Sequence, residues 1–172
     1  MNIKKVSSWH IGVAAEAFAA AQFARYGYNV SVQYGANQPE YDLIAAQGDK
    51  MLKISVKGSQ DGGWGLTQNY KKVDCSYYDA IDKWLDAHGN KTIFCLVQFM
   101  NVDENDMPRM YLAHPAEIAK ELKNARAGNG ETVLWEYHKW GKKAIAQGTE
   151  DIIPNEWVFT AQRAKEMFEK YA

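Results

Sequence analysis

The stretch EYDLIAAQGDKMLKISVK, residues 40–57, decides the fold because it has the pattern of a β-hairpin. Its centre, Gln47-Gly48-Asp49-Lys50, is typical of a tight turn, and β-prone segments lie on both sides of it. We therefore expect one strand over residues 41–46 and a second over residues 51–57. With Gly48 and Asp49 as the two loop residues, Gln47 lies opposite Lys50.

This register divides the side chains of the hairpin between two faces, because opposed residues share a face and so do residues two apart. It places Asp42 opposite Ser55, and Glu40 opposite Lys57. One face is therefore expected to carry Glu40, Asp42, Ser55 and Lys57. The other face carries Leu52, Ile54 and Val56 and is expected to be buried. A shift of one residue would exchange the two faces.

A sheet face with carboxylates beside a lysine suits the hydrolysis of phosphodiester bonds. Carboxylate oxygens bind hard divalent cations such as Mg²⁺. A bound cation polarises the phosphate and lowers the pKa of a bound water. A nearby lysine can orient that water and stabilise the charge that develops on the phosphate.

Outside the hairpin, the sequence alternates between helical and extended patterns, which indicates an α/β fold. Ser7 or Ser8 can cap the first helix, and Gly27 ends it. We expect helices at residues 11–25, 76–88, 115–126 and 160–171, and strands at residues 28–34, 91–100, 109–113 and 132–137. The glycine-rich stretch from Gly58 to Gly65 is expected to be a mobile connector.

The hairpin motifs resemble the signature of the PD-(D/E)XK, or restriction-endonuclease-like, nucleases. Pro39-Glu40-Tyr41-Asp42 precedes Ile54-Ser55-Val56-Lys57, as an acid on one strand precedes acid-x-Lys on the next strand in that family. The motif Ile11-Gly-x-x-Ala-Glu16 in the first helix also resembles small members of the family. Holliday-junction resolvases and group I intron endonucleases are the most similar types. The resemblance extends over residues 11–60.

The resemblance implies a fold and an activity. The fold is a restriction-endonuclease-like mixed central sheet flanked by helices, with residues 1–172 forming a single nuclease-like domain. The activity is metal-dependent hydrolysis of DNA. Mg²⁺ or Mn²⁺ would be held by Asp42, Glu16 and the main-chain carbonyl of Val56, and Lys57 would position the water. Glu40 would support the catalytic group.

Ser55 departs from the family pattern, because it occupies the position of the middle acid. A hydroxyl is a poor substitute for a carboxylate ligand, so Glu40 or Glu16 would have to supply the missing charge. The alternative is a catalytically degenerate domain of the same fold that binds nucleic acid or a protein partner. A third interpretation is an unrelated α/β interaction or immunity protein.

Each site residue also has a structural interpretation. Glu16 is an acid in an otherwise apolar helix and could simply reach solvent at the helix edge. Asp42 could be a carboxylate at a strand edge, and Lys57 an exposed lysine that protects an edge strand. Glu40 could form an ion pair with Lys57.

Three further residues are candidates for contacts with nucleic acid. Gln60 follows Lys57 by three positions, Trp64 in the glycine-rich stretch could stack on a base, and Lys53 shares the face of Lys57. Lys53 equally fits a solvated edge. The segment 135–143 interleaves aromatic residues and lysines, which suits either a strand-binding surface or core aromatics beside a solvated edge.

Composition limits the other possibilities. The net charge of −1 means that a nucleic-acid site needs locally clustered Lys or Arg. The two cysteines, Cys75 and Cys95, form neither a zinc ribbon nor a disulfide framework. Serine-hydrolase and dinucleotide motifs are absent. We expect a cytoplasmic protein that acts on duplex or branched DNA, and a homodimer is compatible with cutting both strands.

Overall fold

A computed structural model describes residues 5–33, 41–144 and 146–172 and divides the chain into two compact units. Unit 1 contains residues 1–61, 90–114 and 156–172, and unit 2 contains residues 62–89 and 115–155. The single domain expected over residues 1–172 stays a prediction. Among the described helices, none has the length and apolar content needed to cross a membrane.

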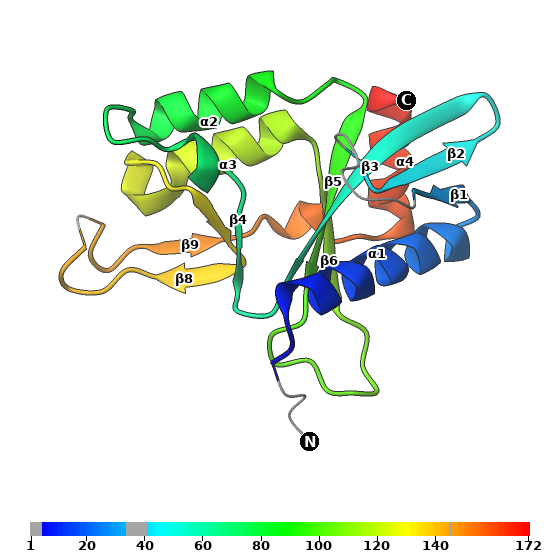
Figure 1. Cartoon of the computed structure of the whole chain (residues 1–172), viewed down its shortest axis with the longest axis horizontal. Coiled ribbons are helices and arrows are strands. Elements are labelled where there is room, and N and C mark those ends of the chain that lie inside the picture. The colour runs from blue at the N-terminus through cyan, green and yellow to red at the C-terminus, as the bar shows by residue number, and fades with distance from the viewer. Residues whose placement is uncertain (1–4, 34–40, 145) are drawn as a thin grey trace. The chain divides into compact units, whose positions relative to one another are not determined.

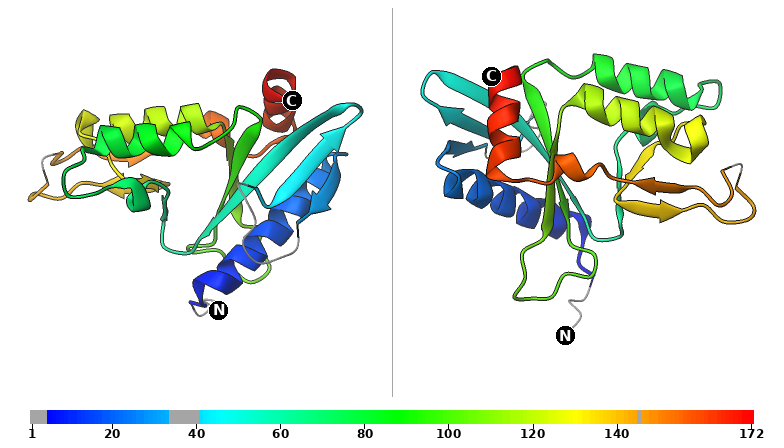
Figure 2. Two further views of the ribbon diagram at one scale, coloured as in Figure 1. Left: turned by 45° about the horizontal axis from the view of Figure 1, so that its top comes forward. Right: turned by 180° about the vertical axis from the view of Figure 1, so that it is seen from behind.

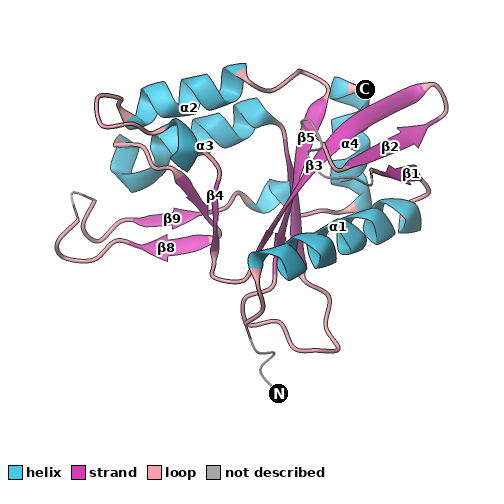
Figure 3. Cartoon of the chain, in the orientation of Figure 1, coloured by secondary structure: helices cyan, strands magenta, loops and turns pink. Residues whose placement is uncertain are grey.

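Unit 1 is built on a mixed five-stranded sheet with the order β1-β2-β3-β5-β6 (Figures 1 and 3). The strands are β1 (Asn29–Val32), β2 (Leu43–Gln47), β3 (Lys50–Ser59), β5 (Thr92–Gln98) and β6 (Arg109–Ala113). β3 and β5 are parallel, and every other neighbouring pair in this sheet is antiparallel. The predicted α/β fold with a mixed central sheet is therefore confirmed.

The register of the β2–β3 hairpin agrees with the prediction. Gln47 pairs with Lys50, and the ladder runs to the pair Leu43 and Ile54. Gly48 has a φ of 60°, a conformation that glycine adopts without steric cost. The face that carries Leu52, Ile54 and Val56 is buried, with exposures of 1%, 0% and 6%. It forms part of the main hydrophobic core.

Two helices contribute to the same core of unit 1. α1 (Ser8–Arg25) begins after Ser7, whose side chain accepts a hydrogen bond from the main-chain N–H of His10. α4 (Ala161–Tyr171) follows Thr160, which caps it in the same way, and runs beside the sheet (Figure 2, right). α1 packs so closely on β3 that a Cβ at Gly58 would lie 2.8 Å from Ile11 and 2.9 Å from Ala15. Glycine at position 58 therefore sets the distance between α1 and β3.

Unit 2 combines a helical pair with two small antiparallel sheets. α2 (Tyr77–Asp86) and α3 (Pro115–Gly128) lie side by side (Figures 1 and 2). β4 (Gly63–Gly65) pairs with β7 (Val133–Trp135), and β8 (Tyr137–Lys139) pairs with β9 (Glu150–Ile152). The short helices are η1 (Gln68–Tyr70) and η2 (Asn155–Trp157). The strand predicted over residues 132–137 is thus divided between β7 and β8.

The prediction of a mobile connector over residues 58–65 is wrong. β3 continues to Ser59, and Gly63–Gly65 forms β4. Trp64 pairs with Leu134 of β7 and is only 3% exposed. A partner strand about seventy residues away therefore orders this glycine-rich segment.

Candidate active site

Asp42 lies immediately before β2, where the hairpin ladder ends. Its main-chain N–H donates to the carbonyl of Ile54 at 2.8 Å, although the strand partner of Ile54 is Leu43. Asp42 and Leu43 thus both face Ile54, which is the two-against-one arrangement of a β-bulge. The predicted pairing of Asp42 with Ser55 lies beyond the ladder as formed. Asp42 therefore lies beside β3 at the end of the ladder, and not opposite Ser55 as predicted.

β2 does not pair with β3 beyond Ile54, and there the Asp42 carboxylate is a hydrogen-bond partner of β3. Its Oδ2 accepts a bond of 2.6 Å from the main-chain N–H of Val56. The N–H and C=O of a strand residue point to the same neighbour, so the Val56 carbonyl faces this edge too. The two oxygen groups expected to hold a cation, the Asp42 carboxylate and the Val56 carbonyl, therefore lie on the same side of β3.

Glu16 approaches this edge from α1. The Glu16 side chain is partly buried, and its pKa is raised, first by burial and then by the negative charge of Asp42. The positive charge of Lys57 acts on Glu16 in the opposite direction and lowers the pKa. Charges act on one another in this way only at short range. Glu16 of α1, Asp42 just before β2 and Lys57 of β3 are therefore near enough for their charges to interact, and we call these three groups the cluster.

Ser55 and Lys57 differ in their surroundings although they share a face of β3. Lys57 is exposed, whereas Ser55 is 4% exposed and pairs with Phe94 of β5. The position of the middle acid therefore lies inside the protein. A buried carboxylate requires a paired charge or several hydrogen bonds, and a serine hydroxyl avoids that cost.

The described residues can bind a divalent cation only with help from solvent or substrate. Among them, no group of three or more His, Cys, Asp or Glu side chains is arranged to hold a metal. Glu40 lies outside the described residues. Glu16, Asp42 and the Val56 carbonyl still match Mg²⁺, which commonly binds one or two carboxylates and completes its shell with water and phosphate. The repulsion between Glu16 and Asp42 is the interaction that such a cation would relieve.

The predicted nucleic-acid contacts lie in different settings. Lys53 is exposed on β3, with its Nζ 5.1 Å from the centre of the Tyr41 ring. The amide of Gln60 bonds the N–H and the carbonyl of Val6, at 3.2 and 2.7 Å, and so attaches the segment before α1 to the end of β3. Trp64 is buried in unit 2, so the expectation of an indole free to stack on a base is wrong.

Tyr41 lies beside the candidate site, and we did not single it out from the sequence. It directly precedes Asp42, and its ring contacts Lys53 from the neighbouring strand. Its position just before the bulge at Asp42 could not be derived from an ideal hairpin register. The available signal was an aromatic residue next to the proposed metal ligand.

Comparisons with known proteins give a distant structural likeness. No protein-family model matches the chain, and no curated protein matches it. Among solved structures, Hjc, a Holliday junction resolvase from the archaeal hyperthermophile Archaeoglobus fulgidus, is similar with a TM-score of 0.41 and 14% identity. The likeness covers 73% of this chain and 88% of that chain. The fold class follows from the sheet topology of unit 1, and the site follows from the geometry of its own side chains.

Proposed function

We propose that this protein is a divalent-metal-dependent endonuclease that hydrolyses phosphodiester bonds in DNA. The observation that carries the proposal is the 2.6 Å bond by which the Val56 N–H holds the Asp42 carboxylate beside β3, with the charges of Glu16 and Lys57 near enough to act on one another. Two carboxylates and an amine at one strand edge are the groups that this chemistry requires.

Each residue has a definite role in this proposal. Asp42, Glu16 and the Val56 carbonyl would hold Mg²⁺ or Mn²⁺, and the cation would supply Lewis-acid activation of phosphate and water. The bond from the Val56 N–H fixes the Asp42 carboxylate before any ligand arrives. Lys57 would stabilise the negative charge that develops on the phosphate and orient the attacking water. Glu40 and Ser55 stay proposed supporting residues.

Nicking of supercoiled plasmid DNA with Mg²⁺, with Mn²⁺ and with a chelator tests this function. The wild type should nick in the presence of metal, and both Asp42→Ala and Lys57→Ala should be inactive. Asp49→Ala and Lys50→Ala are matched controls, because they remove the same kinds of charge from the exposed end of the same hairpin. If all five proteins cleave equally, a contaminant is responsible and the proposal fails.

A second candidate function is a nuclease-fold domain that binds nucleic acid or a protein partner without cutting. The burial of Ser55 in place of an acid favours it, because the described site then holds two carboxylates. DNA binding that survives chelation, with no cleavage under any metal, would support this function. Activity on defined substrates tests the choice between duplex and branched DNA, and sedimentation analysis tests the homodimer. Both stay proposals, and so does the cytoplasmic location.

A further inference from the structure

The three strands β1, β2 and β3 present an outer face that is largely open. Their inward residues, such as Leu43, Ala45 and Leu52, lie in the core of unit 1. Their outward residues are each exposed or partly exposed: Asn29, Ser31, Ile44, Ala46, Met51 and Lys53. The same face of β3 continues to Lys57, so this surface leads directly to the proposed active site.

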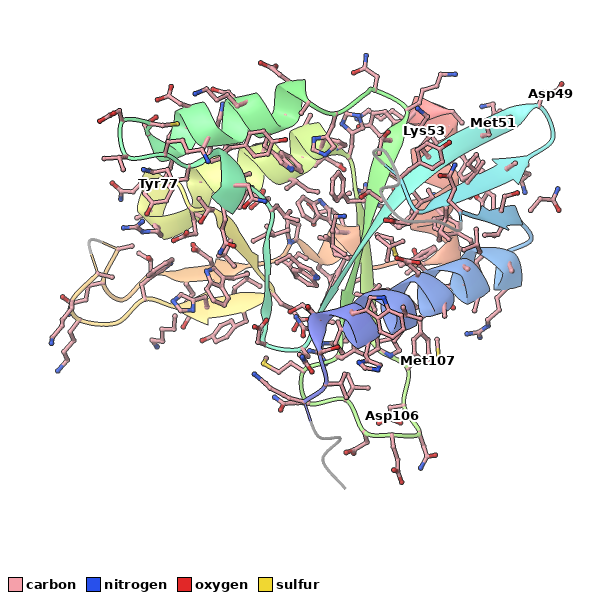
Figure 4. The ribbon with its side chains drawn as sticks, in the orientation of Figure 1. Asp49, Met51, Lys53, Tyr77, Asp106 and Met107 are labelled. Atoms are coloured by element: carbon pink, nitrogen blue, oxygen red, sulfur yellow. The ribbon has the colours of Figure 1, made fainter. Side chains whose placement is uncertain are left out.

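Tyr41 and Lys53 connect this outer face to the catalytic cluster. The Lys53 ammonium lies 5.1 Å from the Tyr41 ring centre, which is within the range of a cation–π interaction. Tyr41 is the neighbour of Asp42 in the chain, and Lys53 precedes Lys57 by four residues on one face. Figure 4 shows Lys53 and Met51 on β3, with Asp49 at the far end of the hairpin.

The charge of this surface suits a polyanion. β1, β2 and β3 contain no Asp or Glu, and Lys53 and Lys57 are the exposed charged residues of their shared face. The face also offers an aromatic ring at Tyr41 and an exposed thioether at Met51, which is 56% exposed. Cations interleaved with aromatic and apolar groups are the features that bind a nucleic-acid strand.

We propose that the outer face of β1–β3 is the binding surface for the DNA that flanks the cleaved bond. Lys53 contacts a backbone phosphate, and Tyr41 and Met51 contact the adjoining sugar or base. Along a strand, Lys53 and Lys57 are about 13 Å apart. The phosphates of a DNA strand wind around its axis, so a span of this length places the Lys53 contact about two nucleotides from the phosphate at Lys57. This inference rests on the proposed nuclease function and extends its site.

Binding of a fluorescent DNA duplex, measured by anisotropy in chelator over a series of salt concentrations, tests this surface. Lys53→Ala should lower the affinity and reduce the slope of log K against log salt by about 1, the loss of one phosphate contact. Lys53→Arg should keep the wild-type slope. Lys50→Ala is the matched control, because Lys50 is an exposed lysine on the alternate face of the same strand. It should also behave as the wild type.

Substitution of Tyr41 tests the aromatic contact separately. Tyr41→Ala should weaken binding by about 5- to 150-fold, the range for loss of one stacking contact, while Tyr41→Phe should bind as the wild type does. Thermal unfolding of each variant shows that the fold is retained. Equal effects of Lys53→Ala and Lys50→Ala, or an unchanged salt slope, would overturn the inference.

Failure of this surface is distinguishable from failure of the nuclease proposal. If Asp42→Ala abolishes cleavage while Lys53→Ala binds DNA like the wild type, the catalytic site stands and the outer face is not the binding surface. If the wild type neither binds nor cleaves DNA, both proposals fail.

Discussion

The two faces of β3 differ in what they contribute to the molecule. Leu52, Ile54 and Val56 lie in the core of unit 1, whereas Lys53 and Lys57 are exposed on the alternate positions. Since side chains alternate along a strand, one segment can carry stability on one face and chemistry on the other. Substitutions on the two faces should therefore have separable effects, on the free energy of unfolding and on the cleavage rate respectively.

The largest expected effect is loss of cleavage in Asp42→Asn. Loss of the charge proposed to hold the cation should lower the nicking rate by about 10³-fold, equivalent to about 4 kcal/mol of transition-state stabilisation. The amide oxygen can still accept the bond from the Val56 N–H, so the melting temperature should stay close to that of the wild type. Nicking rates and thermal unfolding of the same preparations check both parts. Wild-type cleavage by Asp42→Asn would remove Asp42 from the mechanism.

A substitution on the buried face of β3 should lower stability and leave the cleavage rate nearly unchanged. Ile54→Ala removes a side chain with 0% exposure, and we expect it to lower the free energy of unfolding by about 2–5 kcal/mol. The nicking rate per folded molecule should change little. Urea unfolding of Ile54→Ala and Lys57→Ala gives the comparison. A stability loss in Lys57→Ala as large as that in Ile54→Ala would mean that the two faces do not divide these roles.

Ser55 does not fit the contrast between a buried and an exposed face of β3. It lies on the same face as Lys57 and is nevertheless buried. Ser55→Glu places a carboxylate in this buried position, so in chelator the variant should lose about 1–3 kcal/mol of stability. Mn²⁺ should then raise its melting temperature more than that of the wild type, and cleavage should increase. An equal response to Mn²⁺ in both proteins would show that position 55 does not face the cation.

A smaller effect, on the pH dependence of stability, is expected from substitution of Glu16. The pKa of this carboxyl is raised in the folded protein, so the folded state binds more protons than the unfolded state near this pKa. Stability therefore falls as the pH rises from the ordinary pKa of a glutamate through the raised pKa of Glu16. Glu16→Gln should therefore be more stable than the wild type at neutral pH, and the difference should vanish at acidic pH.

Melting temperatures from about pH 4 to about pH 8 check this sign, with Glu104→Gln in an exposed loop as the control. Glu16→Gln should also cleave more slowly, because a proposed cation ligand is lost. If Glu16→Gln is less stable than the wild type at neutral pH, the electrostatic description of the cluster is wrong.

Local chemistry allowed much of unit 1 to be predicted from the sequence. The turn at Gly48 and Asp49 sets the hairpin register, and Ser7 caps the helix that it precedes. These features depend on residues a few positions apart, so their signals are contained in short windows of sequence. The motif pattern also predicts that Glu16 acts together with Asp42 and Lys57, and this stays a prediction.

The features that escaped prediction depend on distant contacts. Trp64 is buried because β4 pairs with β7, and Asp42 lies outside the ladder with its carboxylate bonded to the N–H of Val56. The helical pattern also does not show the break in helical geometry near the end of α3. There Arg126 has a φ of 55°, and its N–H donates to Asp151, which lies 25 positions further along the chain. Such features require the three-dimensional arrangement of the chain.

Calorimetric titration with Mn²⁺, run on the wild type, Asp42→Asn and the control Asp49→Asn, tests the central claim most directly. We predict saturable binding to the wild type and to Asp49→Asn, and an affinity at least about tenfold lower in Asp42→Asn. Absence of binding to the wild type, or equal binding to all three proteins, would contradict a cation site formed by Glu16, Asp42 and the Val56 carbonyl.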